Sequence, residues 1–251
     1  MSPVPFPVRP PRPRDRRRGW SPRHLPAVLV GVLLLTLLPG PGPGAVGAQE
    51  TLLLRPDRVF DGERMQAGWS VLVRDGRIAA AGPTIPEAAG AREIRLAGAT
   101  LLPGLIEGHS HLLLHPYDET PWTDQVLGES LGERVARGVV HAEATLQAGV
   151  TTIRDLGSEG AGYADVGLKA AVEKGVVPGP RLLVAGRALV ATGSYNPRGA
   201  PEWTLPKGAQ EADGYDDLVR VTRDQIGRGA DWVKVYADYR WGPDGEARPT
   251  Y

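Results

Sequence analysis

The 251-residue sequence contains no cysteine. Disulfide bonds and cysteine-ligated zinc are therefore excluded, and a metal site has to use histidine, carboxylate or modified lysine side chains. The chain also lacks net charge, because 29 Lys and Arg balance 29 Asp and Glu. Most of the local excess of arginine lies in residues 1–48, and the remainder is mildly acidic. An acidic remainder gives no reason to expect nucleic acid as a partner.

The first 48 residues have the order of a secretory signal peptide. Arg16, Arg17, Arg18 and Arg23 form a basic region, residues 25–38 are a mostly apolar run without charge, and small residues lead to Ala48. Cleavage after Ala48 is predicted, which makes the protein periplasmic or secreted and limits membrane contact to export. The alternative is a retained membrane anchor, but the apolar run is shorter than the roughly 20 residues that a spanning helix needs.

Residues 49–102 are predicted to form a small all-β domain. Two candidate strands, 69–73 and 77–81, flank an Asp75-Gly76 pair, which is a strong hairpin signal. Further strands are expected at 51–54 and 93–96. The segment is too short to close a sandwich by itself.

Residues 103–251 are predicted to alternate strands and helices. Strands are expected at 104–108, 150–154, 181–185 and 232–236, and helices at 129–147, 163–173 and 215–226. This order is typical of right-handed βαβ units and a parallel sheet, and so of an α/β fold. The spacing suits about four units of a (β/α) barrel. Because a whole barrel takes about 250 residues, we expect only the first half, and therefore a truncated barrel.

Two histidines end the first of these strands. In the stretch Leu101-Leu102-Pro103-Gly104-Leu105-Ile106-Glu107-Gly108-His109-Ser110-His111, His109 and His111 are two positions apart. Residues i and i+2 of a strand point to the same face, so both imidazoles can reach one metal ion. Imidazole suits zinc and its neighbours. Two surface histidines are the alternative that the His-x-His spacing alone leaves open.

The stretch from Pro103 to His111 resembles the first-strand signature of the amidohydrolase superfamily, P-G-hydrophobic-hydrophobic-D-x-H-x-H, with Glu107 where Asp is commoner. The resemblance covers residues 51–251. It implies a metal-dependent hydrolase with a (β/α)8 TIM barrel and a small β-sandwich built from both chain ends, to which residues 49–102 contribute the N-terminal share. Two further His ligands and an Asp that acts as general base are implied after later strands, beyond Tyr251.

The same resemblance implies a role for Lys234, which falls on the fourth strand. In binuclear members a lysine at that place is carboxylated and bridges two metal ions. His109, His111 and carboxylated Lys234 are then metal ligands for two divalent ions, with zinc as the first expectation. Carboxylation of Lys234 is chemically reasonable, because a neutral lysine amine in an apolar strand can take up CO2. An ordinary lysine extending from a strand end is the alternative.

Other polar residues are weaker candidates for the functional site. Tyr236 shares a face with Lys234 and can donate a hydrogen bond to a substrate oxyanion, or simply pack in the barrel. Asp155, after the second strand, is either a site residue or a turn-capping aspartate. His115 either flanks the site or is a solvated loop residue, and His141 is expected on a helix face without a catalytic part. The long segment 186–214 is expected to shape a substrate pocket.

Three short stretches, at 151–155, 179–182 and 234–236, resemble the imidazolonepropionase-like and Xaa-Pro dipeptidase-like branch. The expected function is hydrolysis of amide bonds by metal-activated water, with short peptides, especially dipeptides, as substrates. The alternatives are a cyclic-amide or lactone hydrolase on the same site, and a non-catalytic binding protein or truncated gene product. The complete form is compatible with a homo-oligomer, and the 251-residue chain alone is expected to be inactive.

Overall fold

The computed structural model of the chain describes residues 51–195, 197, 202–240 and 247–249. The predicted signal segment lies outside these residues. In the part of the chain that is described, no helix has the length and apolar character needed to cross a membrane.

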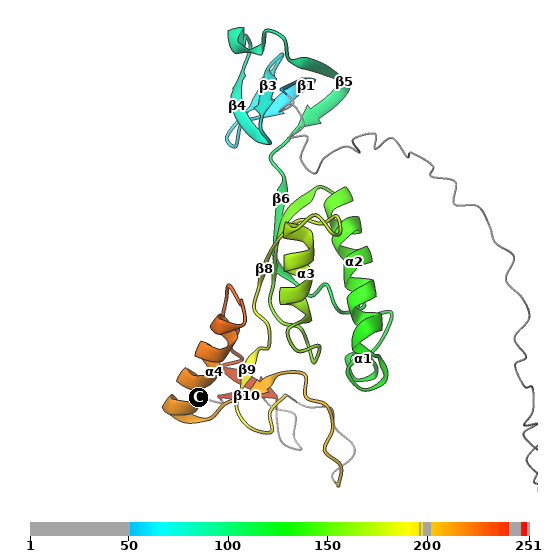
Figure 1. The fold of residues 1–251 in the computed structure, drawn as a ribbon, viewed down its shortest axis with the longest axis vertical. Coiled ribbons are helices and arrows are strands. Elements are labelled where there is room, and N and C mark those ends of the chain that lie inside the picture. The colour runs from blue at the N-terminus through cyan, green and yellow to red at the C-terminus, as the bar shows by residue number, and fades with distance from the viewer. Residues whose placement is uncertain (1–50, 196, 198–201, 241–246, 250–251) are drawn as a thin grey trace, which may run out of the picture. The chain divides into compact units, whose positions relative to one another are not determined.

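Five strands form the N-terminal sheet (Figure 1): β1 (Leu52–Phe60), β2 (Met65–Ala67), β3 (Ser70–Arg74), β4 (Arg77–Gly82) and β5 (Arg92–Leu101). β1 is central, because it pairs antiparallel with β2 and β3 and parallel with β5. A short 3₁₀ helix, η1 (Pro86–Ala88), lies between β4 and β5. The predicted all-β character of this region is confirmed, although β1 and β5 are longer than expected and β2 was not predicted.

The β3–β4 hairpin turns at the predicted Asp-Gly pair. Asp75 and Gly76 have φ angles of 55° and 69°, both in the left-handed region. A two-residue turn with two positive φ angles matches the right-handed twist of the flanking strands, and Asp-Gly is a favoured sequence for it. The sequence therefore determined both the position of this hairpin and its backbone conformation.

A parallel sheet of order β6-β7-β8 follows, formed by β6 (Leu105–Ser110), β7 (Val150–Asp155) and β8 (Arg181–Val184). β6 begins where the chain passes close to β7: a Cβ added to Gly104 would lie 2.0 Å from Oγ1 of Thr151. Glycine is therefore required at this approach. The first three predicted strands of the alternating region are confirmed.

Four helices accompany these strands: α1 (Trp122–Gly128), α2 (Leu131–Gln147), α3 (Ala164–Glu173) and α4 (Gly214–Gly227). The last three were predicted, and α1 was not. α2 begins two residues later than expected because the Ser130 side chain accepts a hydrogen bond from the Glu133 amide and caps the helix. Figure 1 shows α2 and α3 beside the parallel strands, and both helices make contacts with them.

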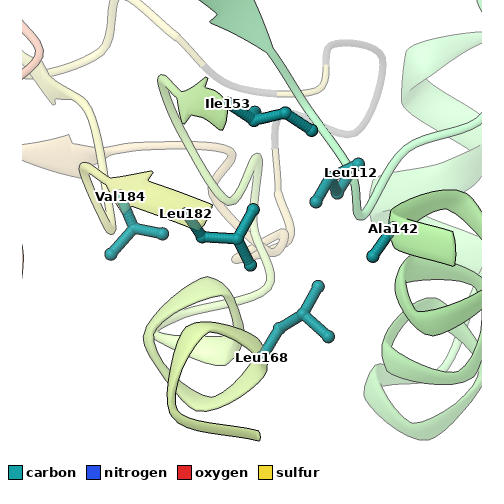
Figure 2. Packing of buried hydrophobic residues seen from close by; sticks show 6 residues of the cluster. All are labelled: Leu112, Ala142, Ile153, Leu168, Leu182 and Val184. Carbon is teal, nitrogen blue, oxygen red and sulfur yellow. The ribbon is translucent and has the colours of Figure 1, made fainter. Parts of the chain in front are cut away.

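The largest core cluster lies between the parallel sheet and these two helices (Figure 2). Ala142 of α2 and Leu168 of α3 meet side chains from β7 and β8, and the cluster consists of Leu112, Ala142, Ile153, Leu168, Leu182 and Val184. α2 approaches closely at Gly138, where an added Cβ would lie 2.8 Å from Cδ2 of Leu113. One face of the strands is thus buried by helices, as the alternating sequence pattern predicts.

The predicted fourth strand, 232–236, is wrong as a regular strand. Only Val235 forms a parallel bridge, with Leu189, fixed by hydrogen bonds from the Leu189 amide to the Lys234 carbonyl and from the Tyr236 amide to the Leu189 carbonyl. The ladder is interrupted on the partner side, because β8 ends at Val184 and the chain turns at Gly186, where φ is 67°. The segment is still tied to the end of β8, because the amides of Asp231 and Trp232 donate hydrogen bonds to the Val184 carbonyl.

The long segment 186–214 contains two short strands that were not predicted, β9 (Leu189–Val190) and β10 (Gln210–Glu211), which pair in parallel. Two more, β11 (Asp238–Arg240) and β12 (Ala247–Pro249), pair antiparallel. Much of segment 186–214 is therefore packed structure, and Ala188, Val190, Tyr195 and Ala209 form a second buried cluster that Trp122 and Tyr236 cover.

Candidate functional site

His109 and His111 lie together at the carboxyl end of β6. Their ring centroids are 5.2 Å apart with an interplanar angle of 61°. His109 is exposed and His111 is half-buried. The prediction that the two imidazoles share one face is confirmed.

The arrangement of these rings fits a divalent metal ion. Nδ1 of His111 is 2.9 Å from the carbonyl oxygen of Gly157, so Nδ1 carries the proton that it donates and Nε2 keeps a lone pair. Partial desolvation and the positive charge of Lys234 hold the pKa of His109 below its usual value. A lowered pKa favours the neutral imidazole, the form that binds metals. Among the described residues, no cluster of three or more His, Cys, Asp or Glu side chains supplies a larger ligand set.

Lys234 and Tyr236 lie on one side of the extended segment that follows α4. Nζ of Lys234 is 5.0 Å from the centroid of the Tyr236 ring, a cation–π contact that orients the amine. The charge of Lys234 also reaches His109, since it is among the causes that lower the pKa of that histidine. The structure thus brings Lys234 within electrostatic reach of His109, although the regular strand predicted to hold Lys234 and Tyr236 is absent here.

Asp155 points away from this group. β7 places the fully buried Ile153 against the helices, and alternation sends Asp155 to the same side. Its carboxylate accepts hydrogen bonds from the amides of Leu112 and Gly157. Of the two roles left open by the sequence, the structure therefore shows the structural one, in which Asp155 fixes the turns that follow β6 and β7.

Burial gives Asp155 a further property that can be measured. Desolvation and the neighbouring Asp165 raise its pKa to about 8. The folded protein therefore keeps a proton that the unfolded chain releases at about pH 4, and the free energy of unfolding should fall as the pH rises between these values. For one group the slope is at most about 1.4 kcal/mol per pH unit.

Thermal melts of metal-free protein at pH 5, 6, 7 and 8 test this expectation, with Asp155→Asn as the comparison. The variant should show a shallower decline of melting temperature with pH, leaving the part due to Asp165, whose pKa burial also raises. The slope is the readout, because the amide costs stability at every pH by pointing an N–H at a backbone donor. An unchanged slope would contradict the assignment.

Glu159 is the residue of this region that the sequence did not reveal. It is 2% exposed, with a left-handed φ of 50°. Oε2 accepts hydrogen bonds from Nε1 of Trp122 at 2.9 Å and from the Tyr195 hydroxyl at 2.7 Å, and Oε1 lies 4.0 Å from Nδ1 of His111. Burial and Glu159 together raise the pKa of Tyr195, so the phenol keeps its proton. The signal available in the sequence was a carboxylate in a glycine-rich turn after a strand.

The chain resembles known proteins both in sequence and in fold. Residues 100–247 match the sequence profile of the amidohydrolase family. The chain belongs to this family. An amidohydrolase crystal structure is similar to it with a TM-score of 0.65 and 31% identity, covering 75% of this chain and 47% of that chain.

Two further relatives of this amidohydrolase have more specific names. A prolidase solved with N-methylphosphonate-L-proline has a TM-score of 0.64 and 26% identity, again covering 75% of this chain and 47% of the other. Ochratoxinase from Aspergillus niger is 33% identical over 160 residues, which are 55% of this chain and 31% of the relative. The chain thus spans about a third of its curated relatives and about half of the solved structures.

Family membership confirms the resemblance carried by the Pro103–His111 stretch. The likeness to Xaa-Pro dipeptidase-like proteins, which stretches 151–155, 179–182 and 234–236 indicated, agrees with the similar prolidase structure. Family membership also confirms the α/β fold of a metal-dependent hydrolase family. The count of barrel units, the share of a sandwich in residues 49–102 and the signal segment stay predictions.

The other two candidate histidines of the amidohydrolase, His115 and His141, line one cavity together with His111. His115 is half-buried rather than solvated, with ring nitrogens 3.5 Å from carboxylates of Glu119 and Glu129. His141 lies on α2, as expected, and its Nδ1 is 3.0 Å from the Leu112 carbonyl oxygen.

Proposed function

We propose that the complete protein is a metal-dependent hydrolase of amide bonds that acts on short peptides, especially dipeptides. The observation that carries this proposal is the paired arrangement of His109 and His111, with the His111 ring oriented by the Gly157 carbonyl. Membership of the amidohydrolase family supports it. The preference for peptides is supported by the similar prolidase structure and by the predicted export of the protein.

In this proposal His109, His111 and Lys234 hold two divalent ions, with zinc expected and Lys234 carboxylated. When bound, such ions supply a Lewis acid that polarises the scissile carbonyl and makes water a nucleophile near neutral pH. The chain itself orients the ligands: the Gly157 carbonyl holds the proton of His111 on Nδ1. Tyr236 lies beside Lys234, with its ring centroid 5.0 Å from Nζ. Tyr236 is the proposed donor to the substrate oxyanion.

The remaining parts of the proposal concern location and partners. The basic, apolar and small-residue order of residues 1–48 supports export with cleavage after Ala48. The partner is then a small molecule or short peptide met outside the cytoplasm, membrane contact ends with export, and a homo-oligomer is compatible with the complete form.

Metal content and substrate preference of the full-length protein test the proposal. Wild type should contain about two zinc ions per chain and Lys234→Ala fewer, while Lys174→Ala, which changes an exposed lysine at the end of α3, should match wild type. A wild type without metal would contradict the metal-dependent hydrolase, and a Lys234→Ala variant with full metal content would contradict the bridging role.

The substrate panel should contain dipeptides, Xaa-Pro included, beside lactones and cyclic amides. Dipeptides should give the highest kcat/KM. If lactones or cyclic amides do so instead, the peptide preference is wrong while the metal-dependent hydrolase is retained.

A further inference from the structure

Glu159 adopts a left-handed backbone conformation, which residues other than glycine mostly avoid. A left-handed backbone costs a non-glycine residue roughly 1–2 kcal/mol, and such strain persists only where the surroundings over-determine it. The turn is indeed held on several sides: a Cβ added to Gly160 would lie 3.3 Å from Cγ1 of Val126 and 3.4 Å from the Lys207 carbonyl oxygen. The Ser158 carbonyl accepts a hydrogen bond from the buried Arg134. Closure of the loop does not by itself explain why a buried carboxylate stands in this turn.

One carboxylate oxygen of Glu159, Oε1, lies near His111. Its Oε1 lies 4.0 Å from Nδ1 of His111 and 3.2 Å from the position of a Cβ on Gly157. Gly157 is the residue whose carbonyl accepts the proton of His111. The negative charge of Glu159 therefore lies behind the ring nitrogen that faces away from a metal ion. A carboxylate at that place favours the Nδ1–H form of the ring and strengthens Nε2 as a ligand.

The other carboxylate oxygen, Oε2, is connected to Lys234 through two aromatic rings. Oε2 accepts the Tyr195 hydroxyl, and the Tyr195 ring stacks on Tyr236 with centroids 4.8 Å apart at 18°. Nζ of Lys234 lies 5.0 Å from the Tyr236 centroid. Trp122, whose indole N–H is bound by the same carboxylate oxygen, packs edge-on against Tyr195 at 5.1 Å. The position of Tyr195, and with it the stack that ends at Lys234, is thus set by Glu159.

We propose that Glu159 is a positioning residue for two metal ligands, acting on His111 through its charge 4.0 Å from Nδ1 and on Lys234 through the Tyr195–Tyr236 stack. The proposal rests on the proposed function, since it needs His111 and Lys234 to bind metal. It adds that ligands from β6 and from the segment after α4 are aligned by one carboxylate from the turn after β7. Loss of a group that orients a metal ligand typically costs about 10- to 100-fold in metal affinity.

Zinc affinity of the full-length protein, measured by competition with a chelator, tests the proposal in three variants. Glu159→Ala removes both carboxylate oxygens and should weaken zinc binding by about 10- to 100-fold. Glu159→Gln keeps an oxygen that accepts from Trp122 and Tyr195 but removes the negative charge behind His111, so it should recover only the part of the affinity that depends on the Tyr195–Tyr236 stack. Tyr195→Phe keeps the ring but breaks the link to Glu159, and should cost about fivefold, the factor expected for one ordinary hydrogen bond. In all three, kcat should fall more than KM rises.

Asp165→Asn is the matched control. Asp165 is 1% exposed, like Glu159, and accepts hydrogen bonds from the amides of Gly186 and Val166. Its substitution should lower the melting temperature while zinc affinity stays within about twofold of wild type. A purely structural role for Glu159 would give its variants this same pattern.

The outcomes separate the two proposals. If wild type binds no zinc, both the proposed function and the positioning role are wrong. If wild type binds zinc and folded Glu159→Ala binds it equally well, only the positioning role is wrong. If Glu159→Ala fails to fold, Tyr195→Phe tests the connection from Glu159 to Lys234 through the Tyr195–Tyr236 stack. This variant deletes one oxygen atom and leaves the packing of the ring in place. Wild-type zinc affinity in Tyr195→Phe would then overturn the proposal.

Discussion

Replacement of His111 by alanine should lower the zinc affinity of the full-length protein by more than about 100-fold and abolish measurable turnover. The reason is that groups which only orient a metal ligand already contribute about 10- to 100-fold to affinity, so loss of the ligand itself should cost more. His111 is also the better oriented of the two histidines, since its Nδ1 lies 2.9 Å from the Gly157 carbonyl oxygen. Metal analysis and kcat/KM with the preferred dipeptide measure both effects.

His115→Ala is the control for this experiment. His115 is half-buried, four residues further along the same connection, and its ring contacts the carboxylates of Glu119 and Glu129. Its substitution should leave zinc affinity near that of wild type, with at most a change in stability. If His111→Ala retained the zinc content of wild type, or if His115→Ala lost it equally, His111 could not be the ligand.

Ile153→Ala should produce the largest loss of stability among single core substitutions in the parallel sheet. Ile153 is fully buried on the central strand β7, where it packs in the cluster between the strands and helices α2 and α3. Truncation of such a side chain removes buried methyl groups and leaves a cavity, at a cost of about 3 kcal/mol. For a chain of this size the melting temperature should then fall by roughly 6–12 °C.

Ile226→Ala provides the comparison, because Ile226 is 57% exposed on α4. The same chemical change there should alter the free energy of unfolding by less than about 0.5 kcal/mol. Calorimetry of both variants measures the difference. Equal shifts in the two variants would show that the cluster around Ile153 is not the core of this sheet.

The parts of the fold that the sequence predicted are those set by short-range patterns. Apolar periodicity identified β6, β7, β8 and helices α2, α3 and α4, and the Asp75-Gly76 pair identified a hairpin. The adjacency of His109 and His111 followed from alternation along a strand. The side that Asp155 faces was left open by the sequence, and alternation settles it only once the structure shows Ile153 in the core.

The parts that were missed depend on contacts between distant segments. Glu159 meets Trp122 and Tyr195, which are 37 and 36 residues away in the sequence, and no local pattern relates these positions. The irregular form of segment 232–236 depends on the turn at Gly186 in its neighbour. Strands β9 and β10 are two residues long, too short for periodicity to reveal.

The way in which the Lys234 backbone is held leaves the side chain beside it free to vary. The bridge between Leu189 and the lysine segment is made by main-chain atoms alone, through the Lys234 carbonyl and the Tyr236 amide. Main-chain bonds do not depend on which side chain residue 189 carries. Another apolar side chain that fills the buried position of residue 189 can therefore replace leucine while the lysine backbone keeps its place. Repacking of the interior beside Lys234 and the position of its main chain are then separable.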